Sequence, residues 1–429
     1  MSNWWKKDKD IVWHPYTSLV TEKIPLAVKK AKGVYLHTED GRKIIDGVSS
    51  WWVNILGHAN PKIAKAIARQ AKTLEHVIFA GFTHKPAVDL SEKLLTKIVP
   101  STHSKVFFSD NGSTAVEVAI KMALQYWFNK GENRERVLAW DGAYHGDTFG
   151  TMSIGSPSAF NKPFQKKLYD VTFIPFPENG DEEYTIQAFT EEVKKGDVAL
   201  FIFEPLIQGT SGMRMYSPQL LDKLMDIANE YGVICISDEV MTGFSRTGKT
   251  LAIDYLRNKP DIIAMSKGIT GGFMPLGITT CSQKIENAFL DKDIYKTFFH
   301  GHSYTGNPLA CAAANKSIDL LLSNKIQKKI TDLVTSQKLF ADKMSKNKKL
   351  KVRALGTVFA AELITESQTS YFSDIRDKLY DFFLQKDILL RPLGNIVYIM
   401  PPYTITKKEL QKIYKTFEEA VQLFEENNL

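Results

Sequence analysis

VICISDEV, residues 233–240, and DIIAMSK, residues 261–267, decide how this sequence folds. Each is a short apolar run that ends in a charged residue, Asp238 in the first and Lys267 in the second. Near-continuous hydrophobicity of this kind is typical of strands that are buried on both faces of a parallel sheet. Because ligands bind at the carboxyl ends of the strands in such sheets, we expect both charges to face one crevice.

The segment from roughly residue 105 to 325 alternates strand-like runs with helical ones. Further expected strands are KVFFS (105–109), RVLAW (136–140), VTFIPF (171–176), ALFIFEP (199–205) and GITTCS (277–282). Helices are expected over residues 113–129 and 218–231, the second opened by Ser217-Pro218. Strands that alternate with helices predict an α/β domain with a mainly parallel central sheet and right-handed crossovers.

The two ends of the chain are expected to form a smaller α+β domain together. The N-terminal part carries turns and short strand-like runs such as GVYLHTEDGRKIIDG, and the C-terminal part closes with an amphipathic helix from Thr406. We therefore assign residues 1–60 and 326–429 to the small domain and residues 61–325 to the large one. No internal repeat or long linker separates these parts, which predicts an extensive interface between them.

The composition is typical of a soluble globular protein. The 429 residues are 44% apolar and 24% charged, and the net charge of +7 is a mild excess that does not indicate nucleic-acid binding. The longest apolar runs fall far short of the roughly 18 residues that span a bilayer. Cys235, Cys281 and Cys311 each lie in an apolar segment, which favours buried thiols in a reducing compartment. We expect a cytoplasmic protein that binds no metal.

GFSRTGKT, residues 243–250, fits the phosphate-loop pattern G-x-x-x-x-G-K-[ST] and raises the alternative of an NTPase. Its context argues against a nucleotide site. Asp238 and Glu239 precede it at a strand end, where carboxylates would repel a triphosphate, and the LAIDYLRNKP that follows is not a firm helix. The next strand ends in Lys267, where a nucleotide site needs an aspartate for Mg²⁺. A non-catalytic basic binding protein, suggested by the lysine-rich run at 343–353, is another alternative.

A lysine and an aspartate in one crevice fit the chemistry of pyridoxal 5'-phosphate (PLP). Desolvation pushes a lysine toward its neutral amine, which is nucleophilic and can form a Schiff base with an aldehyde. Asp238 would remain charged opposite the protonated pyridine nitrogen of the cofactor. An ion pair between Asp238 and Lys267 that bridges two strands explains the same residues, so the pair alone leaves both interpretations open.

Two further segments favour the cofactor. In SDNGSTAVE, residues Asn111, Gly112 and Ser113 open a helix whose free N–H groups and positive dipole end attract a phosphate, although an ordinary helix cap would use the same residues. In GAYHGDTFG, Tyr144 and His145 are available to cover the pyridine ring, although an ordinary turn with a half-buried tyrosine fits as well. Because these elements all lie at consecutive strand ends, a PLP site is favoured over a simple ion pair between Asp238 and Lys267.

The chain resembles the class III, ornithine-transaminase-like branch of the fold-type I PLP enzymes. The segments that carry the resemblance are SDNGSTAVEVAIKMA, GAYHGDTFGTMSIG, EPLIQGTSGMRMYSP, ISDEVMTGFSRTGK, SKGITGG and HGHSYTGNPLACAAA. It extends from Trp13 to beyond Tyr403 and implies the fold-type I architecture, an aminotransferase activity and PLP as cofactor. It also implies that GFSRTGKT borders the substrate site and that its phosphate-loop pattern is accidental.

The resemblance implies roles for the residues that match the family motifs. Lys267 would hold PLP covalently, Asp238 would pair with its ring nitrogen, and Val240 would pack on one ring face. Gly112 and Ser113 would bind the phosphate. The phosphate and substrate sites would be completed from a second subunit.

The segment GHSYTGN carries this expected contribution of the second subunit. Ser303 would supply a hydroxyl to the phosphate, with His302 beside it and Gly301 at the substrate. Many relatives have Pro-Thr where this chain has His302-Ser303, so the hydroxyl is kept while its neighbour differs. A site that borrows residues across subunits implies an obligate homodimer with the active site at the interface.

WHPYTS, GVSSWW and RPLGNIVYIMPPY narrow the resemblance to enzymes of biotin synthesis that convert 8-amino-7-oxononanoate to 7,8-diaminononanoate, with S-adenosylmethionine as amino donor. Tyr16, Trp51, Trp52 and Tyr144 would line the substrate cleft, and Tyr16 is also counted among the catalytic residues. Aromatic walls suit both an aliphatic chain and a sulfonium cation. Arg391 would bind the distal carboxylate of the keto acid through a bidentate pair.

Alternatives within the PLP enzymes stay open at this point. Some relatives use lysine as the amino donor, and the sequence does not distinguish the two donors. Another class III ω-aminotransferase, acting on ornithine, 4-aminobutyrate or another diamine, is the nearest alternative function, although WHPYTS and GVSSWW argue against it.

Several polar and aromatic residues are given supporting roles. Arg246 and Asp147 are expected near Tyr16 and the substrate ketone. Five of the seven tryptophans fall within the first 52 residues, which predicts that this segment packs against something. For Trp4 and Trp5, packing in the core or in a dimer contact is the favoured interpretation.

Overall fold

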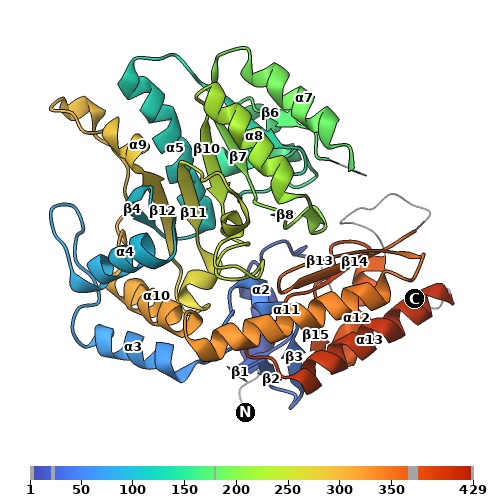
Figure 1. Ribbon diagram of the computed structural model, residues 1–429. Helices are drawn as coiled ribbons and strands as arrows, with labels where there is room; N and C mark the ends of the chain where they lie inside the picture. The colour runs from blue at the N-terminus through green and yellow to red at the C-terminus, as the bar shows by residue number, and fades with distance from the viewer. Residues whose placement is uncertain (1–3, 21–24, 178–179, 366–374, 427–429) are drawn as a thin grey trace.

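The computed structural model describes residues 4–20, 25–177, 180–365 and 375–426. A seven-stranded sheet with the order β4-β12-β11-β10-β7-β5-β6 forms the centre of the large domain (Figure 1). Its strands are β4 (His103–Ser109), β5 (Arg136–Trp140), β6 (Thr172–Ile174), β7 (Val198–Phe203), β10 (Ile234–Asp238), β11 (Ile262–Met265) and β12 (Gly277–Ser282). The α/β architecture expected from the sequence is therefore confirmed.

One strand of this sheet runs against the others. β12 pairs antiparallel with both β11 and β4, whereas the remaining strands are parallel to one another. GITTCS resembles the parallel strands in sequence, because all six of its residues are of a kind that can be buried, and all six are buried. Burial on both faces predicts a central strand, but it does not encode the direction of that strand.

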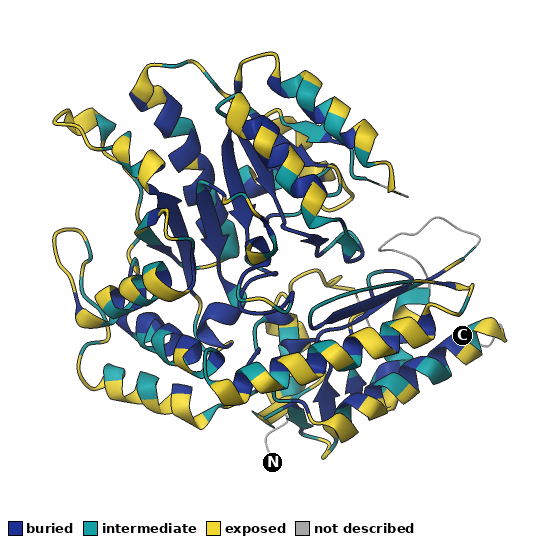
Figure 2. Cartoon of the chain, viewed as in Figure 1, coloured by how far each residue is buried: buried dark blue, intermediate teal, exposed yellow. Residues whose placement is uncertain are grey.

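Alternate residues of the central strands enter separate cores on the two faces of the sheet. In β10, Ile234 and Ile236 pack into the core beside α5 (Gly112–Lys130), whereas Cys235 joins the core that contains the apolar face of α8 (Pro218–Glu230). Figure 2 shows the buried strands between helices whose outer faces are exposed. The charged side chains of Asp238 and Lys267 therefore lie where β10 and β11 end, and not inside the strands.

Other helices cover the large domain and join it to the small one. They are α3 (Pro61–Ala71), α4 (Lys85–Lys97), α6 (Phe149–Ser153), α7 (Glu182–Val193), α9 (Gln283–Asn287) and α10 (Pro308–Leu321). Shorter elements are the 3-10 helices η1 (Lys162–Lys167), η3 (Ala252–Tyr255), η4 (Lys267–Thr270) and η5 (Ile294–Lys296), and the small hairpin of β8 (Ile207–Gln208) and β9 (Arg214–Met215).

Both ends of the chain build the small α+β domain, as expected. One sheet has the order β1-β2-β3-β15 and joins β1 (Val28–Lys32), β2 (Tyr35–Thr38) and β3 (Lys43–Asp46) to β15 (Ile388–Leu389). The other contains β13 (Leu350–Leu355), β14 (Val358–Leu363) and β16 (Ile396–Ile399), and the helices are α2 (Ser49–Trp52), α11 (Asn324–Met344), α12 (Ile375–Gln385) and α13 (Lys407–Glu425). Figure 1 shows the N-terminal strands, in blue, beside the C-terminal helices, in red. The boundaries at residues 60 and 325 stay a prediction.

The N-terminal helix α1 (Trp4–Ile11) does not pack into the core of its own chain, which was one of the two expectations for Trp4 and Trp5; packing in a dimer contact stays a prediction. It buries none of its residues, and Trp4 and Trp13 are 49% and 77% exposed. Five of the eight residues of α1 are charged, which leaves it without an apolar face wide enough to join a core. The tryptophans of this segment therefore remain available for contacts outside the chain.

Cys235, Cys281 and Cys311 are free and buried, as their apolar context predicted. Burial raises the pKa of each thiol above its ordinary value, so these side chains behave as inert core residues. Among the described residues, no helix combines the length and the apolar character needed to cross a membrane.

Candidate active site

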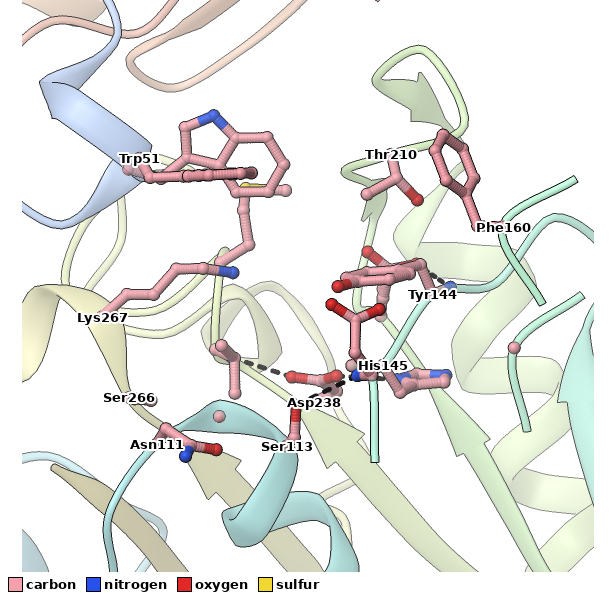
Figure 3. Close-up of a pocket in the computed structure, with 18 of the residues that line it drawn as sticks. Trp51, Asn111, Ser113, Tyr144, His145, Phe160, Thr210, Asp238, Ser266 and Lys267 are labelled. Atoms are coloured by element: carbon pink, nitrogen blue, oxygen red, sulfur yellow. Dashed lines mark hydrogen bonds and ion pairs between the residues drawn. The ribbon is translucent and has the colours of Figure 1, made fainter. Parts of the chain in front are cut away.

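Asp238 and Lys267 lie in one cleft at the edge of the central sheet. Asp238 is the last residue of β10, and Lys267 begins η4 two residues after β11 ends. The two strands are parallel, with Asp238 opposite Ala264, so both residues emerge at the same edge. Both line a cleft of about 1030 Å³, and Figure 3 shows the Lys267 amine extending into the space bordered by Trp51, Tyr144 and Asp238. The juxtaposition predicted from the sequence is present.

The Lys267 amine lies in apolar surroundings. Its Nζ is 4.8 Å from the centre of a Trp52 ring. Burial lowers the pKa of Lys267 below its ordinary value, and the negative charges of Asp238 and Glu204 oppose this shift. Lys267 also has a φ of 44°, in the left-handed region that lysine seldom adopts. A lysine with a lowered pKa presents more of the neutral amine, which is the nucleophilic form.

The Asp238 carboxylate is fixed by a partner on each oxygen. His145 Nδ1 lies 2.7 Å from Oδ2, and the Val240 N–H donates to Oδ1 at 3.0 Å. The His145 side chain is fully buried and that of Asp238 is 6% exposed. The sequence predicts His145, like Tyr144, as a cover for the ring, whereas in the structure His145 lies against Asp238. The remaining lone pairs of the carboxylate are available to a cation in the cleft.

The N-terminus of α5 opens onto the same cleft. Asn111 and Thr114 form a capping box, in which the Asn111 Oδ1 accepts from the Thr114 N–H at 3.0 Å and the Thr114 Oγ1 accepts from the Asn111 N–H at 3.1 Å. A helix leaves the N–H groups of its first turn without intrahelical partners, and here Gly112 and Ser113 line the cleft. A Cβ at position 112 would lie 2.7 Å from Val240 Cγ1, so glycine keeps this approach to the backbone open.

Glu204 is a cleft residue to which the sequence analysis gave no role. It directly follows β7, is 5% exposed, and accepts hydrogen bonds from the N–H groups of Tyr144 at 3.2 Å and Gly209 at 2.8 Å. Burial raises the pKa of Glu204 to about 7. The signal for this residue was present in the sequence, because Glu204, like Asp238, is a carboxylate at the end of an apolar run.

Four aromatic residues predicted to face the substrate line the cleft. They are Tyr16, Trp51, Trp52 and Tyr144. The Tyr16 and Trp51 rings are 5.7 Å apart, and the Tyr16 hydroxyl lies 3.5 Å from that of Tyr144. The Tyr16 hydroxyl also donates to the Asp147 carboxylate, which places Asp147 near Tyr16 as expected. These contacts join the N-terminal segment to the loop that follows β5.

The two arginines singled out in the sequence lie in different environments. Arg391 lines the cleft, with its guanidinium carbon 4.8 Å from the centre of the Trp51 ring. Arg246 is 1% exposed and donates to the main-chain carbonyls of Trp52 at 3.1 Å and Pro401 at 3.2 Å. Arg246 therefore braces the backbone behind Trp52 and is not among the described residues that line the cleft.

The turn that carries Trp51 and Trp52 is strained. Ser49, Ser50 and Trp52 have φ angles of 53°, 60° and 69°, all in the left-handed region. Each such residue costs on the order of 1–3 kcal/mol, so the turn persists only because its surroundings hold it.

The phosphate-loop pattern does not form a nucleotide site. Residues 243–247 are buried, and Lys249 donates to the Asp254 carbonyl at 2.9 Å. The pattern is followed by the 3-10 helix Ala252–Tyr255, so the α-helix N-terminus that would bind a phosphate is missing at this position.

The segment expected from a second subunit does not line the cleft of its own chain, although His302 contacts Asp110, which does. Gly301, His302 and Ser303 are outside the described residues that line the cleft. Gly301 and Ser303 are exposed, and His302 Nδ1 lies 3.3 Å from Asp110 Oδ2. The contribution of this segment to a phosphate or substrate site stays a prediction.

The family model for class III aminotransferases matches residues 16–421. The chain belongs to this family. The aminotransferase is 47% identical to the adenosylmethionine-8-amino-7-oxononanoate aminotransferase of Synechococcus elongatus, over 94% of this chain and 96% of the relative. The crystal structure of the protein of the same name from Methanocaldococcus jannaschii has a TM-score of 0.90 at 32% identity, covering 96% of this chain and 98% of that one. A PLP-bound amine transaminase from an uncultivated Pseudomonas species has a TM-score of 0.88 at 27% identity, covering 95% of this chain and 97% of that one.

PLP is the cofactor of this aminotransferase, and the cleft has the functional groups that it needs. Lys267 offers an amine of lowered pKa for the aldehyde, and Asp238 offers a carboxylate for the pyridine nitrogen. Gly112 and Ser113 line the cleft in the first turn of α5, whose N–H groups would bind the phosphate, and Gly112 has no Cβ to collide with Val240. When bound, PLP supplies an electron sink that stabilises negative charge on the carbon that carries the amino group.

Proposed function

We propose that this aminotransferase transfers an amino group to 8-amino-7-oxononanoate to give 7,8-diaminononanoate in biotin synthesis, with S-adenosylmethionine as the amino donor. The observation that carries the proposal is the cleft in which an amine, aromatic walls and an arginine face one space, at Lys267, Trp51, Tyr144 and Arg391. The names of the relatives from Synechococcus elongatus and Methanocaldococcus jannaschii support the same reaction.

The acceptor side of the cleft matches the chemistry of the keto acid. An aliphatic chain gains by lying along aromatic faces, which Trp51, Trp52 and Tyr16 offer. The guanidinium of Arg391, 4.8 Å from the Trp51 ring, puts a positive charge beside this apolar wall. Arginine binds a carboxylate through two parallel hydrogen bonds, so Arg391 would fix the far end of the acceptor and thereby its reacting ketone.

The residues on the cofactor side would then have separate tasks. Lys267 would bind the cofactor aldehyde and would be the group available to move a proton at the carbon that carries the amino group. Asp238, held by His145, would keep the pyridine nitrogen protonated. Gly112 and Ser113 would hold the phosphate with main-chain N–H groups. The Tyr16 hydroxyl and its partner Asp147 would orient the substrate.

We also infer a cytoplasmic homodimer with the active site at the subunit interface. Ser303 is exposed and lies outside the cleft of its own chain, which suits a residue that completes the site of a neighbour. Trp13, Tyr295 and Phe299 are 77%, 78% and 66% exposed, and a second copy would cover such side chains. The three free, buried thiols suit a reducing compartment. Light scattering on the purified protein should give the mass of a dimer; a fully active monomer would contradict this inference.

Half-reactions test the proposed function directly. The purified holoenzyme is mixed with S-adenosylmethionine or with lysine, and the cofactor absorbance is followed before the keto acid is added. We expect S-adenosylmethionine to change the spectrum and the keto acid to restore it, with 7,8-diaminononanoate detected by mass spectrometry. A response to lysine alone would overturn the assignment of the donor. If neither donor yields 7,8-diaminononanoate, the proposed function is wrong.

A further inference from the structure

A buried carboxylate outside the cleft holds the strained turn that carries Trp51 and Trp52. Asp46, the last residue of β3, is 0% exposed and is not among the described residues that line the cleft. Its Oδ1 accepts the Val48 N–H at 3.0 Å, and its Oδ2 accepts the Ser50 N–H at 2.7 Å. The carboxylate thus binds the backbone at the entrance of the turn and again in its middle.

His58 completes this arrangement from the other side of Asp46. Its Nε2 lies 2.8 Å from Asp46 Oδ2, and its side chain is 10% exposed. The backbone of His58 forms two hydrogen bonds with Gly33, of 2.7 and 3.1 Å, so the imidazole is carried by a fixed segment. Asp46 is fixed as well, because β3 is paired with both β2 and β15.

The chemistry of this cluster requires a carboxylate. Both oxygens of Asp46 accept hydrogen bonds from main-chain N–H groups, and Oδ2 also faces the imidazole of His58. An asparagine would place an NH₂ group at one of these oxygens, so that two donors would face each other in a buried position. The pair of Asp46 and His58 therefore does more than fill space in the core of the small domain, because the hydrogen bonds at Asp46 require a carboxylate.

The strained turn fixes the positions of two rings that line the cleft. Trp51 contacts the guanidinium of Arg391 at 4.8 Å, and Trp52 lies 4.8 Å from the Lys267 amine. The indole of Trp52 also donates to the Tyr398 hydroxyl at 3.0 Å. A turn that relaxed toward ordinary φ angles would rotate both indoles away from these partners, because successive side chains follow the backbone dihedrals.

We propose that Asp46 and His58 are positioning residues, which keep the turn at Ser49–Trp52 in the strained form that presents Trp51 and Trp52 to the acceptor. They act on acceptor affinity through these two rings and touch neither substrate nor cofactor. The inference rests on the proposed function, because the acceptor is the ligand that contacts the rings.

The test compares the variants His58→Ala, His58→Gln and Asp46→Asn in the holoenzyme. Loss of a hydrogen bond to a charged group should raise the KM for 8-amino-7-oxononanoate roughly 10- to 100-fold in His58→Ala and Asp46→Asn, with little change in kcat at saturation. Glutamine can place its Nε2 near the position of the imidazole Nε2, so His58→Gln should recover most of the affinity. If Asp46→Asn does not fold, the comparison of His58→Ala with His58→Gln carries the test.

His103→Ala is the matched control. His103 is also a buried histidine with two hydrogen bonds: its Nδ1 accepts from the Thr280 hydroxyl at 2.8 Å, and its Nε2 donates to the Pro260 carbonyl at 3.0 Å. It is not among the described residues that line the cleft. Its variant should lose thermal stability as His58→Ala does, while the KM for the acceptor stays at the parent value. An unchanged KM in His58→Ala, with stability lowered to the same extent, would reduce Asp46 and His58 to a purely structural role and overturn the inference.

A second measurement does not depend on the substrate. The fluorescence anisotropy decay of Trp51, taken as the difference between each protein and its Trp51→Phe counterpart, should become faster in His58→Ala and return in His58→Gln. If the parent enzyme does not convert the keto acid, the proposed function fails while this readout still reports on the turn. An unchanged decay in His58→Ala would overturn the positioning role itself.

Discussion

The two sides of the cleft are built from different kinds of structure. The cofactor side consists of strand ends and a helix N-terminus within the large sheet domain, at Asp238, Lys267 and Gly112. The acceptor side consists of turns from the two ends of the chain, at Trp51 and Arg391. Strand ends are fixed by main-chain hydrogen bonds on both sides, whereas the turns depend on a few side chains. With the roles proposed above, the chemistry would lie on rigid elements and the choice of substrate on segments that tolerate change.

Removal of the Lys267 amine is expected to have the largest effect and to break the cofactor side. Lys267→Ala removes both the group that binds the aldehyde and the group that moves the proton. Proton transfer alone is worth roughly 10²- to 10⁴-fold, so kcat should fall by at least about that factor. Single-turnover kinetics with preloaded PLP measure the loss.

Lys249→Ala is the control for this substitution. Lys249 is the lysine of the phosphate-loop pattern, but it is exposed and bonded to the Asp254 carbonyl. Its variant should keep parent activity and cofactor content. A loss of activity in Lys249→Ala comparable to that in Lys267→Ala would contradict the assignment of the catalytic lysine.

Asp238→Asn should have the next largest effect, again on the cofactor side. The amide keeps the shape of the side chain and one acceptor, but it loses the charge that would face the pyridine nitrogen. Removal of one preorganised electrostatic partner costs roughly 10²- to 10³-fold in kcat. The cofactor spectrum and kcat should change together, while the KM for the acceptor stays near its parent value. A large change in the KM for the acceptor with kcat retained would contradict the assignment of Asp238 to the cofactor side.

Arg391→Ala should affect the acceptor side alone. Loss of hydrogen bonds to a carboxylate costs about 1.5–3 kcal/mol, which corresponds to a roughly 10- to 100-fold rise in the KM for the keto acid. The donor half-reaction should change much less. The KM of Arg391→Lys for the keto acid should lie between those of the parent and Arg391→Ala, because lysine keeps the charge but loses the bidentate geometry. Equal losses in both half-reactions would remove the assignment of Arg391 to the acceptor carboxylate.

Glu204 links the end of a sheet strand to the aromatic wall of the cleft, because it follows β7 and accepts the N–H of Tyr144. Burial raises its pKa from 4.5 to about 7. Between these pH values the folded protein holds a proton that the unfolded chain has lost, so the free energy of unfolding falls as the pH rises through this window. Glu204→Gln removes the titration and should reduce this fall by roughly 2–3 kcal/mol between pH 5 and pH 8. Urea unfolding at pH 5 and pH 8 measures it.

Glu239 offers the comparison for this pH effect. Burial also raises its pKa to about 7, but Glu239 is not among the described residues that line the cleft, and its carboxylate accepts from the Thr242 hydroxyl and the Ile253 N–H. Glu239→Gln should therefore show the same pH trend in stability without a change in the KM for the acceptor. A parent protein that gains stability between pH 5 and pH 7 through these groups would contradict the direction of both shifts.

Much of the cofactor side could be predicted from the sequence, because its signals are local. An apolar run that ends in a charge marks a buried strand and its functional end, and this pattern placed Asp238 and Lys267 correctly in one cleft. Glu204 also ends an apolar run, yet no role is predicted for it from the sequence. The family motifs added Arg391 and the tryptophans, which no local pattern connects to the cleft.

The rest depends on contacts that the sequence does not encode locally. His145 lies against Asp238 because of the path of a glycine-rich turn, and the letters of that turn fit a ring cover equally well. Arg246 is charged, yet it is buried because it satisfies two carbonyl groups from distant segments. The role of Asp46 emerges only from the strained turn beside it, whose φ angles belong to residues that rarely adopt them.

The pairing of β15 with β3 sets an order of events during synthesis of the protein. Ile388 lies opposite Ile45 and Leu389 opposite Asp46, so one of the earliest strands to leave the ribosome has one of the latest as its neighbour. Until then the nascent chain carries β3 with an open edge, a template for pairing with the wrong partner. The wall of the cleft that carries Arg391 is therefore completed late, and a chain that stopped ahead of Leu389 would have Asp238, Lys267 and Trp51 without it.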